Sequence, residues 1–314
     1  MNKNKKNLTE LNRVEALIKK DFSKEETISG LYKYIFKSNG KKIRAKLCLV
    51  ASSKTNYKER IKLASVIELL HTATLIHDDV VDNSPTRRGV KSVNNLWTNS
   101  HGVLIGDYIY SKAFIYLVDI GNKKILKELA NTTNDIAQGE LIQLDAIKNV
   151  DVNLKKLEKI SYFKTGRLFE AAAKTGAIIS NENNTFISNI SECAKNLGIL
   201  FQITDDLLDY SDNKKIGKPV FQDIKEGKIT YPFFYAYKNA NIKQKKYLKE
   251  LLGVSKRIQS KDIELIKSLE GIKKTTQLAD KYHQRAVEYA KKIKNLDIRE
   301  EMIELANTAL NRDK

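Results

Sequence analysis

The chain has 314 residues, of which 41% are apolar and 30% charged, and this balance excludes fibrous and intrinsically disordered proteins. Its 56 lysines and arginines outnumber 38 acidic residues, but the net charge of +18 is scattered, which indicates a solvated surface and no nucleic-acid-binding patch. Two cysteines are too few for a disulfide framework, and no stretch resembles a membrane span, so we expect a cytoplasmic protein without stable membrane insertion.

Apolar residues recur at three- and four-residue spacing along most of the chain, over lengths that strands do not reach. The expected helices are two within 9–36, then 44–52, 59–82, 92–99, 102–119, 123–146, 153–179, 185–211 and several from about Thr230 to the end. Turn-rich loops are expected at 83–91 and 212–227. Only three prolines occur, and no repeat or low-complexity linker divides the chain, so one all-α domain covering residues 1–314 is predicted.

An acidic cluster ends the helix expected at 59–82. The segment ELLHTATLIHDDVVD places Asp78, Asp79 and Asp82 at its C-terminal end, where positions 78 and 82 share one face. Three carboxylates there repel one another and oppose the negative end of the helix dipole. This unfavourable arrangement predicts a positive group that compensates for it.

A second cluster repeats the pattern near the end of the helix expected at 185–211. Its sequence, FQITDDLLDY, contains Asp205, Asp206 and Asp209. Either cluster alone could be a solvated helix end, whereas two D-D-x-x-D motifs in apolar helices of one chain indicate a functional pair. Hard carboxylate oxygens in a water-filled cleft suit Mg²⁺, which takes its remaining ligands from substrate phosphates and water.

Cations accompany both clusters. Arg87 and Arg88 lie in a turn just after the first one, where guanidinium groups could hold a diphosphate or could merely neutralise the aspartates. Upstream, the segment Gly40-Lys41-Lys42-Ile43-Arg44 puts cations at a helix start, which favours anions. His71 lies two turns before Asp78 and could also be an ordinary core histidine. Weaker polar candidates are Lys164, Thr165, Gln202, Lys218 and Lys228.

Together these segments resemble the trans-type polyprenyl diphosphate synthase family, over nearly the whole chain and in the same order. The motif around Gly40 to Arg44 is similar to the family's G-G-K-R-x-R-P segment. HDDVVDNSPTRRG resembles its first aspartate-rich motif, and FQITDDLLD followed by GKPVFQDIKEGKITYP resembles its second. The departures, which concern loop geometry, are Asn39, Lys42, Ala45 and Tyr231.

The resemblance implies a large helical bundle of the isoprenoid synthase type with a central cavity, and a homodimer. It implies isopentenyl diphosphate and an allylic diphosphate as substrates, with about two or three Mg²⁺ ions as cofactor. The implied metal ligands are Asp78, Asp82 and Asp205, with Asp79, Asp206 and Asp209 completing or supporting the metal-binding surface. The residues implied to hold the allylic diphosphate are Arg87, Lys164, Thr165 and Lys218, with Lys228 nearby. Those implied to bind isopentenyl diphosphate are Lys41, Arg44, His71 and Arg88, with Gln202 near the reacting groups.

The residues one turn before the first cluster bear on product length. Ala73 and Thr74 lie five and four positions before Asp78, where a bulky side chain would close a cavity for the growing chain. In the family, aromatic residues there are associated with short products, so Ala73 implies a long-chain synthase near octaprenyl. Alternatively, Ala73 only permits tight helix packing.

Four other functions stay open at this stage. A shorter-chain, geranylgeranyl-type synthase would use the same motifs. A terpene cyclase shares the fold but has no use for a second diphosphate site. A non-catalytic subunit of a heteromeric synthase would be inactive alone, and a nucleic-acid binder would show salt-sensitive affinity for DNA or RNA.

Overall fold

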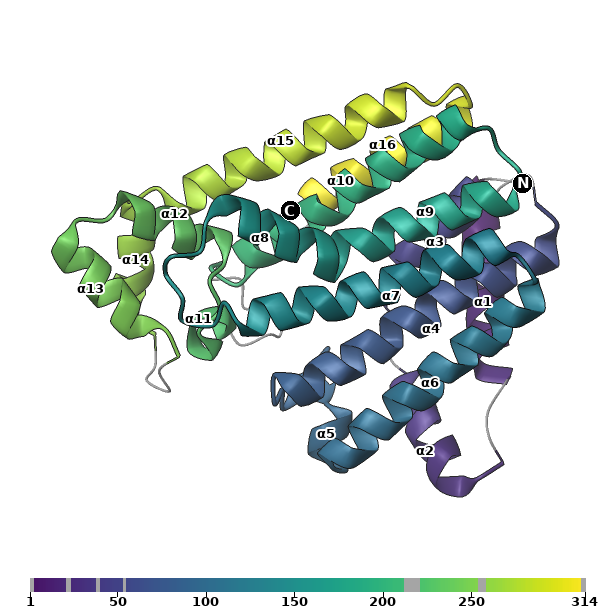
Figure 1. Cartoon of the computed structure of the whole chain (residues 1–314), viewed down its shortest axis with the longest axis horizontal. Coiled ribbons are helices and arrows are strands. Elements are labelled where there is room, and N and C mark those ends of the chain that lie inside the picture. Colours follow the sequence, from purple (N-terminus) through teal and green to yellow (C-terminus); the bar gives the residue numbers. More distant parts are fainter. Residues whose placement is uncertain are drawn as a thin grey trace. The chain divides into compact units, whose positions relative to one another are not determined.

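The computed structural model of the chain describes residues 3–20, 24–37, 40–52, 55–211, 221–253 and 258–311, and it is almost entirely helical (Figure 1). The helices are α1 (Lys3–Lys20), α2 (Glu26–Ile35), α3 (Ile43–Ala51), α4 (Tyr57–Val81), α5 (Val93–Leu96), α6 (Asn99–Ile120), α7 (Lys123–Leu144), α8 (Leu154–Ser161), the π-helical turn η1 (Tyr162–Gly166), α9 (Arg167–Ile179), α10 (Asn184–Leu208), α11 (Gln222–Glu226), α12 (Tyr231–Asn239), α13 (Ile242–Leu251), α14 (Ser260–Ser268), α15 (Gly271–Lys291) and α16 (Leu296–Leu310). The predicted all-α fold is confirmed.

The chain forms two compact units. Unit 1 comprises Met1–Thr133 and Ala171–Ser191, and unit 2 comprises Asn134–Glu170 and Glu192–Lys314. Helices α7, α9 and α10 contribute residues to both units. One domain over residues 1–314 stays a prediction.

Helix α4 is the centre of unit 1 and packs against α1, α3 and α6. Its residues Leu63, Ile67 and Leu70 are fully buried, so burial of apolar surface holds this helix in place. Figure 1 shows α4 and α6 side by side. They approach closely because α6 has glycine at two crossing positions: a Cβ on Gly102 would lie 2.6 Å from a Val80 methyl group, and one on Gly106 would meet the His77 ring.

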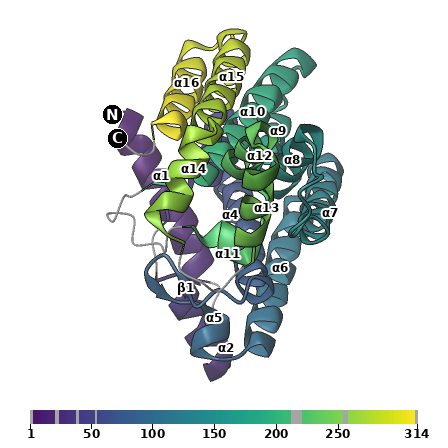
Figure 2. The same cartoon turned by 90° about the vertical axis from the view of Figure 1, so that its left-hand side faces the viewer.

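Unit 2 is built on α12, which packs against α13, α14 and α15, while α15 packs against α16 (Figure 2). Phe233 of α12, Ala286 of α15 and Met302 of α16 are completely buried. Pro232 stands in the first turn of α12, where its missing N–H costs no helical hydrogen bond. Apolar side chains of different sizes from three helices thus fill this core.

Three segments differ from the prediction or add to it. The stretch 153–179, predicted as one helix, contains the π-helical turn η1 between α8 and α9, an insertion that apolar spacing does not reveal. The predicted loop 212–227 contains the short helix α11, so this part of the loop prediction was wrong. The predicted turn at 83–91 contains a small antiparallel hairpin of β1 (Thr86–Arg87) and β2 (Val90–Lys91).

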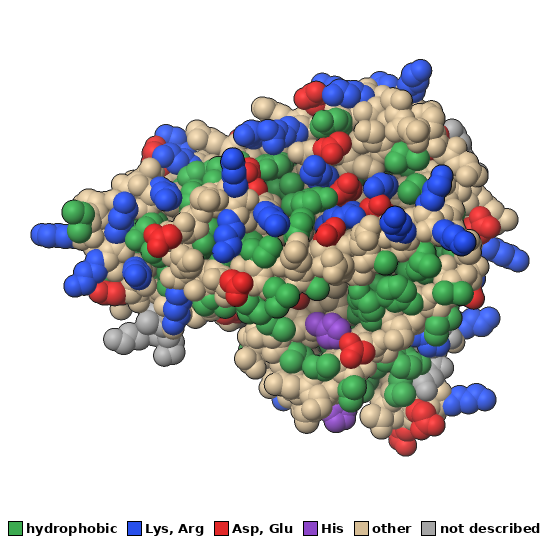
Figure 3. Space-filling model, in the orientation of Figure 1, with side chains coloured by type: hydrophobic (Ala, Val, Ile, Leu, Met, Phe, Trp, Pro, Cys, Tyr) green, Lys and Arg blue, Asp and Glu red, His purple; other side chains and the backbone are tan. Residues whose placement is uncertain are grey.

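The surface bears on the charge and membrane predictions. Within the described ranges, none of the helices combines the length and apolar character needed to span a membrane. On the face drawn in Figure 3, lysine and arginine side chains are interspersed with acidic and apolar ones. A surface for nucleic acid would instead gather its cations along one track.

Candidate active site

The first aspartate cluster closes α4 in unit 1. The backbone N–H of Asp82, the residue after the helix, donates to the Asp78 carbonyl oxygen at 2.8 Å. Asp79 is buried and accepts two hydrogen bonds from Arg87, one of them from Nε at 2.9 Å. Burial raises the pKa of Asp79, and Arg87 opposes that rise. The middle aspartate is therefore hydrogen-bonded to Arg87, and Asp78 and Asp82, one turn apart, share another face of the helix.

The second cluster, at the end of α10 in unit 2, has the same internal arrangement. Its middle carboxylate, Asp206, is buried and accepts from Gln202 Nε2 at 2.9 Å and from the backbone N–H of Tyr231 at 3.3 Å. Burial raises the pKa of Asp206 to about 7, and the charges of Asp205 and Asp209 add to the rise. Asp205, one position earlier, is only half-buried.

Asp209 has a different task, because its two carboxylate oxygens accept the backbone N–H groups of Gln222 and Asp223, each at 3.0 Å. These bonds fix the start of α11, which has no cap of its own. Asp223 was missed by the sequence reasoning. Burial raises its pKa well above the usual range, with Asp209 and Asp206 adding to the rise, so it belongs to this acidic group.

The basic residues of unit 2 come from η1 and the segment after α11. Lys164 Nζ lies 2.7 Å from a Glu140 oxygen and 2.9 Å from Gln143 Oε1. Thr165 donates to Gln202 Oε1 at 2.7 Å, so the turn is tied to the residue that holds Asp206. The sequence reasoning missed Glu140 and Gln143, whose only signal was their place in an apolar helix.

Lys228 and Lys218 complete the predicted unit 2 set. Lys228 is buried, and its Nζ pairs with Glu226 at 2.7 Å while its backbone N–H donates to the Asp223 carbonyl at 2.8 Å. Lys218 lies outside the described residues. Lys228 therefore stands beside the acidic group already bound to a neighbouring carboxylate.

The basic residues of unit 1 gather between α3, α4 and the β1–β2 turn. Arg44 Nη1 lies 3.0 Å from His71 Nε2. Arg88 has a left-handed backbone, with φ of 52°, and its guanidinium group lies against Gly40. Lys41 is exposed in the same segment. These four predicted cation or imidazole groups therefore share one region of unit 1.

A metal-binding role rests on the chemistry of these donors. Within the described ranges, no three histidine, cysteine, aspartate or glutamate side chains form a preformed metal cluster. Carboxylates of Asp78, Asp82 and Asp205 are the oxygen ligands that Mg²⁺ prefers, and Mg²⁺ commonly takes one or two carboxylates and completes its shell with phosphate and water. Each cluster therefore offers carboxylates whose chemistry fits a divalent ion that binds together with a diphosphate.

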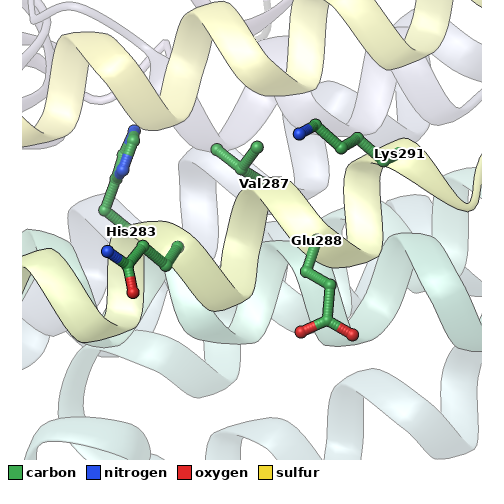
Figure 4. Close-up of a pocket in the computed structure, with 5 residues that line it drawn as sticks. His283, Val287, Glu288 and Lys291 are labelled. Atoms are coloured by element: carbon green, nitrogen blue, oxygen red, sulfur yellow. The ribbon is translucent and has the colours of Figure 1, made fainter.

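A depression also lies on α15 (Figure 4). Its lining includes His283, whose Nε2 lies 2.7 Å from Asn307 Oδ1. Figure 4 shows Glu288 pointing away from the side on which His283, Val287 and Lys291 project. This depression contains none of the predicted site residues and offers no converging carboxylates.

Comparison with known proteins identifies the family. The family model described as polyprenyl synthetase matches residues 25–270. The chain belongs to the polyprenyl synthetase family. It is 32% identical over 304 residues to octaprenyl diphosphate synthase of Escherichia coli K12, covering 95% of this chain and 94% of the relative. It is 35% identical over 301 residues to an all-trans-nonaprenyl-diphosphate synthase (geranyl-diphosphate specific) of Rhodobacter capsulatus, covering 92% and 90%.

Solved structures agree with this membership. A decaprenyl diphosphate synthase from Rhodobacter capsulatus superposes with a TM-score of 0.90 at 31% identity, covering 98% of this chain and 97% of the other. A polyprenyl synthase from Caulobacter crescentus CB15, complexed with calcium and isoprenyl diphosphate, gives 0.92 at 29% identity, covering 98% and 95%. The isoprenoid synthase fold and a metal-dependent prenyl transferase acting on isoprenoid diphosphates follow from the family.

The position expected to bear on product length is fully buried in this polyprenyl synthetase. Ala73 of α4 is 0% exposed, and Thr74 donates its hydroxyl to the His71 carbonyl at 2.8 Å. A larger side chain at position 73 must therefore either enter a cavity or displace its neighbours. The prediction of a long product stays a prediction at this point.

His71 gives a prediction for the pH dependence of stability. Burial lowers its pKa well below 6.5, and the charges of Arg44, Arg88 and Arg87 lower it further. Because the unfolded histidine takes up a proton near pH 6.5 and the folded one does not, the free energy of unfolding falls as pH drops below about 6.5. We expect the wild-type melting temperature to fall more between pH 7 and 5.5 than that of His71→Gln. Equal losses would contradict this assignment.

Gly40 gives a prediction for substrate affinity. A methyl group at position 40 would lie 2.6 Å from Nη1 and 2.9 Å from Nη2 of Arg88, so Gly40→Ala must displace that guanidinium. We expect the KM for isopentenyl diphosphate to rise about tenfold, as for a loss of ~1.4 kcal/mol, with an unchanged melting temperature. The control is Gly30→Ala, since an added Cβ there meets nothing within 4 Å. An unchanged KM in Gly40→Ala would contradict the role of Arg88.

Proposed function

We propose that this prenyl transferase extends farnesyl diphosphate with successive isopentenyl diphosphates to an all-trans polyprenyl diphosphate near the octaprenyl length. The main support is a feature that the two aspartate clusters share. In each cluster the middle carboxylate is buried and hydrogen-bonded to the protein, and a neighbouring aspartate near the helix end is half-buried. The octaprenyl and nonaprenyl names of the relatives support the long product.

Residue roles follow from chemistry and from the family. We assign Asp78, Asp82 and Asp205 to about two or three Mg²⁺ ions, which when bound would neutralise the charge of the leaving diphosphate. Asp79, Asp206 and Asp209 orient the elements that carry these ligands through the bonds described above. The residues assigned to the allylic diphosphate are Arg87, Lys164, Thr165 and Lys218. Those assigned to isopentenyl diphosphate are Lys41, Arg44, His71 and Arg88.

The reaction needs no side-chain nucleophile. The C–O bond of the allylic diphosphate breaks, and the diphosphate leaves with the bonding electron pair, stabilised by cations such as Lys164 and Arg87. The double bond of isopentenyl diphosphate then attacks the allylic carbocation and forms the new C–C bond. A proton leaves the adjacent carbon to the departing diphosphate, which restores a double bond.

The neutral imidazole of His71 suits this scheme. Its Nε2 accepts from Arg44, so the other ring nitrogen carries the proton and can donate to a phosphate oxygen. The neighbouring cationic side chains supply positive charge, while the imidazole N–H of His71 supplies a hydrogen-bond donor with a defined direction. This pairing supports assignment of the region to the second diphosphate.

The deciding experiment uses purified protein, Mg²⁺, farnesyl diphosphate and labelled isopentenyl diphosphate, with sizing of the products. We expect chains near eight isoprene units. Products that stop at geranylgeranyl length would support the shorter-chain alternative. No turnover by the protein alone would favour a non-catalytic subunit, and turnover without isopentenyl diphosphate would favour a cyclase.

We propose a homodimer formed through α6. Its side chains Leu104, Ile115 and Val118 lie on one helical face and are 68%, 54% and 69% exposed. A row of exposed apolar residues on one helix favours contact with a second apolar surface. We expect light scattering to give a dimer mass for the wild type and a monomer mass for Leu104→Lys/Val118→Lys. A monomeric wild type would contradict the proposal.

We also propose a cytoplasmic location. Cys48 and Cys193 are free thiols in the buried core, and burial raises the pKa of each to about 12. Such thiols have little thiolate and are inert, as expected for structural cysteines in a reducing compartment. Fractionation of cells, with the protein followed by antibody, tests this location.

A further inference from the structure

Glu68 is a buried carboxylate with no assigned role, and it interacts through its charge with Arg44, Lys42 and Arg88 of unit 1. It stands on α4, three residues before His71 on the same face, and is 8% exposed. Its Oε1 accepts the backbone N–H of Ala45 at 3.1 Å. A buried carboxylate is costly unless it is paired and hydrogen-bonded, so its position calls for a function.

The bond to Ala45 fixes the start of α3. Helix α3 begins at Ile43 after Lys42, which has a left-handed backbone with φ of 46° and provides no side-chain cap. Ala45 is the third residue of this helix, so its N–H has no partner within the helix, and Glu68 of α4 supplies one. Arg44 lies one position before Ala45, and Glu68 thereby sets the place from which Arg44 extends to His71.

Glu68 also interacts with the cations of unit 1 through its charge. Burial raises the pKa of Glu68, while Arg44, the Ala45 N–H, Lys42 and Arg88 oppose the rise. In return, Glu68 raises the pKa of Arg88, which burial and Arg87 lower. Of the nearby cations, Lys42 is paired with Glu15 at 2.6 Å and Arg87 with Asp79. The charge of Glu68 therefore acts on both Arg44 and Arg88.

We propose that Glu68 is a positioning residue that holds Arg44 and Arg88 in the arrangement that receives isopentenyl diphosphate. The inference rests on the proposed function of this region. Two effects of the carboxylate charge oppose each other, since it repels a diphosphate but also attracts the guanidinium groups of Arg44 and Arg88 and so organises them. The organising effect dominates, because Arg–phosphate recognition depends on the direction of several hydrogen bonds.

The test compares Glu68→Gln with wild type in steady-state assays. The amide keeps the volume and can still accept from Ala45, but it lacks the charge. We expect the KM for isopentenyl diphosphate to rise about tenfold, with kcat and the KM for farnesyl diphosphate within about twofold of wild type. Glu68→Asp retains the charge and should restore part of the affinity.

Controls separate positioning from stability. Glu10→Gln removes another buried carboxylate of unit 1, which is paired with Arg60 at 2.5 Å, and should lower the melting temperature without the selective KM effect. An unchanged or lower KM in Glu68→Gln, or parallel changes in both KM values and kcat, would overturn the inference. If the wild type itself has no prenyl transferase activity, the proposed function fails instead.

Discussion

Asparagine in place of Asp78 or Asp205 is expected to lower kcat by about 10³-fold, the upper range for removal of one group that stabilises charge in a transition state. Asparagine has the same shape but lacks the charge that holds a divalent ion. Both residues are only half-buried and lie at helix ends, so the melting temperature should change little. Steady-state assays at saturating Mg²⁺ measure the effect.

Three further aspartate-to-asparagine variants serve as comparisons for Asp78→Asn and Asp205→Asn. Asp119→Asn in unit 1 and Asp280→Asn in unit 2 alter exposed side chains and should leave kcat unchanged. Asp206→Asn alters a buried carboxylate that holds Gln202 and the Tyr231 backbone, so stability should fall along with activity. A smaller loss of kcat in Asp205→Asn than in Asp206→Asn would contradict the assignment of Asp205 as a ligand.

Phenylalanine in place of Ala73 is expected to shorten the product by several isoprene units while turnover continues. Ala73 is completely buried on α4, five residues before Asp78, so a phenyl ring there would occupy space deeper along the helix than the reacting end. Chromatography of dephosphorylated products measures their length. A product distribution identical to wild type would show that Ala73 serves helix packing alone.

The same substitution at a second buried alanine distinguishes filling of a product cavity from general overpacking of the core. Ala64 lies on the same helix, nine residues earlier, and is also fully buried. Overpacking typically costs about 1–3 kcal/mol, so Ala64→Phe should lower the melting temperature. We expect its products to keep the wild-type length, whereas shortened products from this variant too would remove the special role of position 73.

The sequence was sufficient for the fold and for the location of both clusters, because apolar spacing and repeated acidic motifs are local signals. It did not reveal which aspartate of each cluster is buried. That depends on Arg87 for Asp79 and on Tyr231 for Asp206, contacts that spacing along one helix does not encode.

Residues that act through tertiary contacts were missed for the same reason. Glu68 reaches Ala45, 23 positions away, and Glu140 reaches Lys164, 24 positions away. In the sequence each is a single charge within an apolar helix, which is equally typical of a solvated position. The sequence predicted that the helix start at Arg44 attracts an anion. One of the backbone N–H groups there, that of Ala45, already donates to the Glu68 carboxylate.

The most direct test counts the divalent ions bound in the presence of diphosphate. Mn²⁺ replaces Mg²⁺ as an electron paramagnetic resonance probe, and inorganic diphosphate replaces the substrate. The account predicts about two or three diphosphate-dependent ions in the wild type, and fewer in both Asp78→Asn and Asp205→Asn. If either variant keeps the wild-type number and affinity, the two clusters do not hold a common metal and diphosphate assembly.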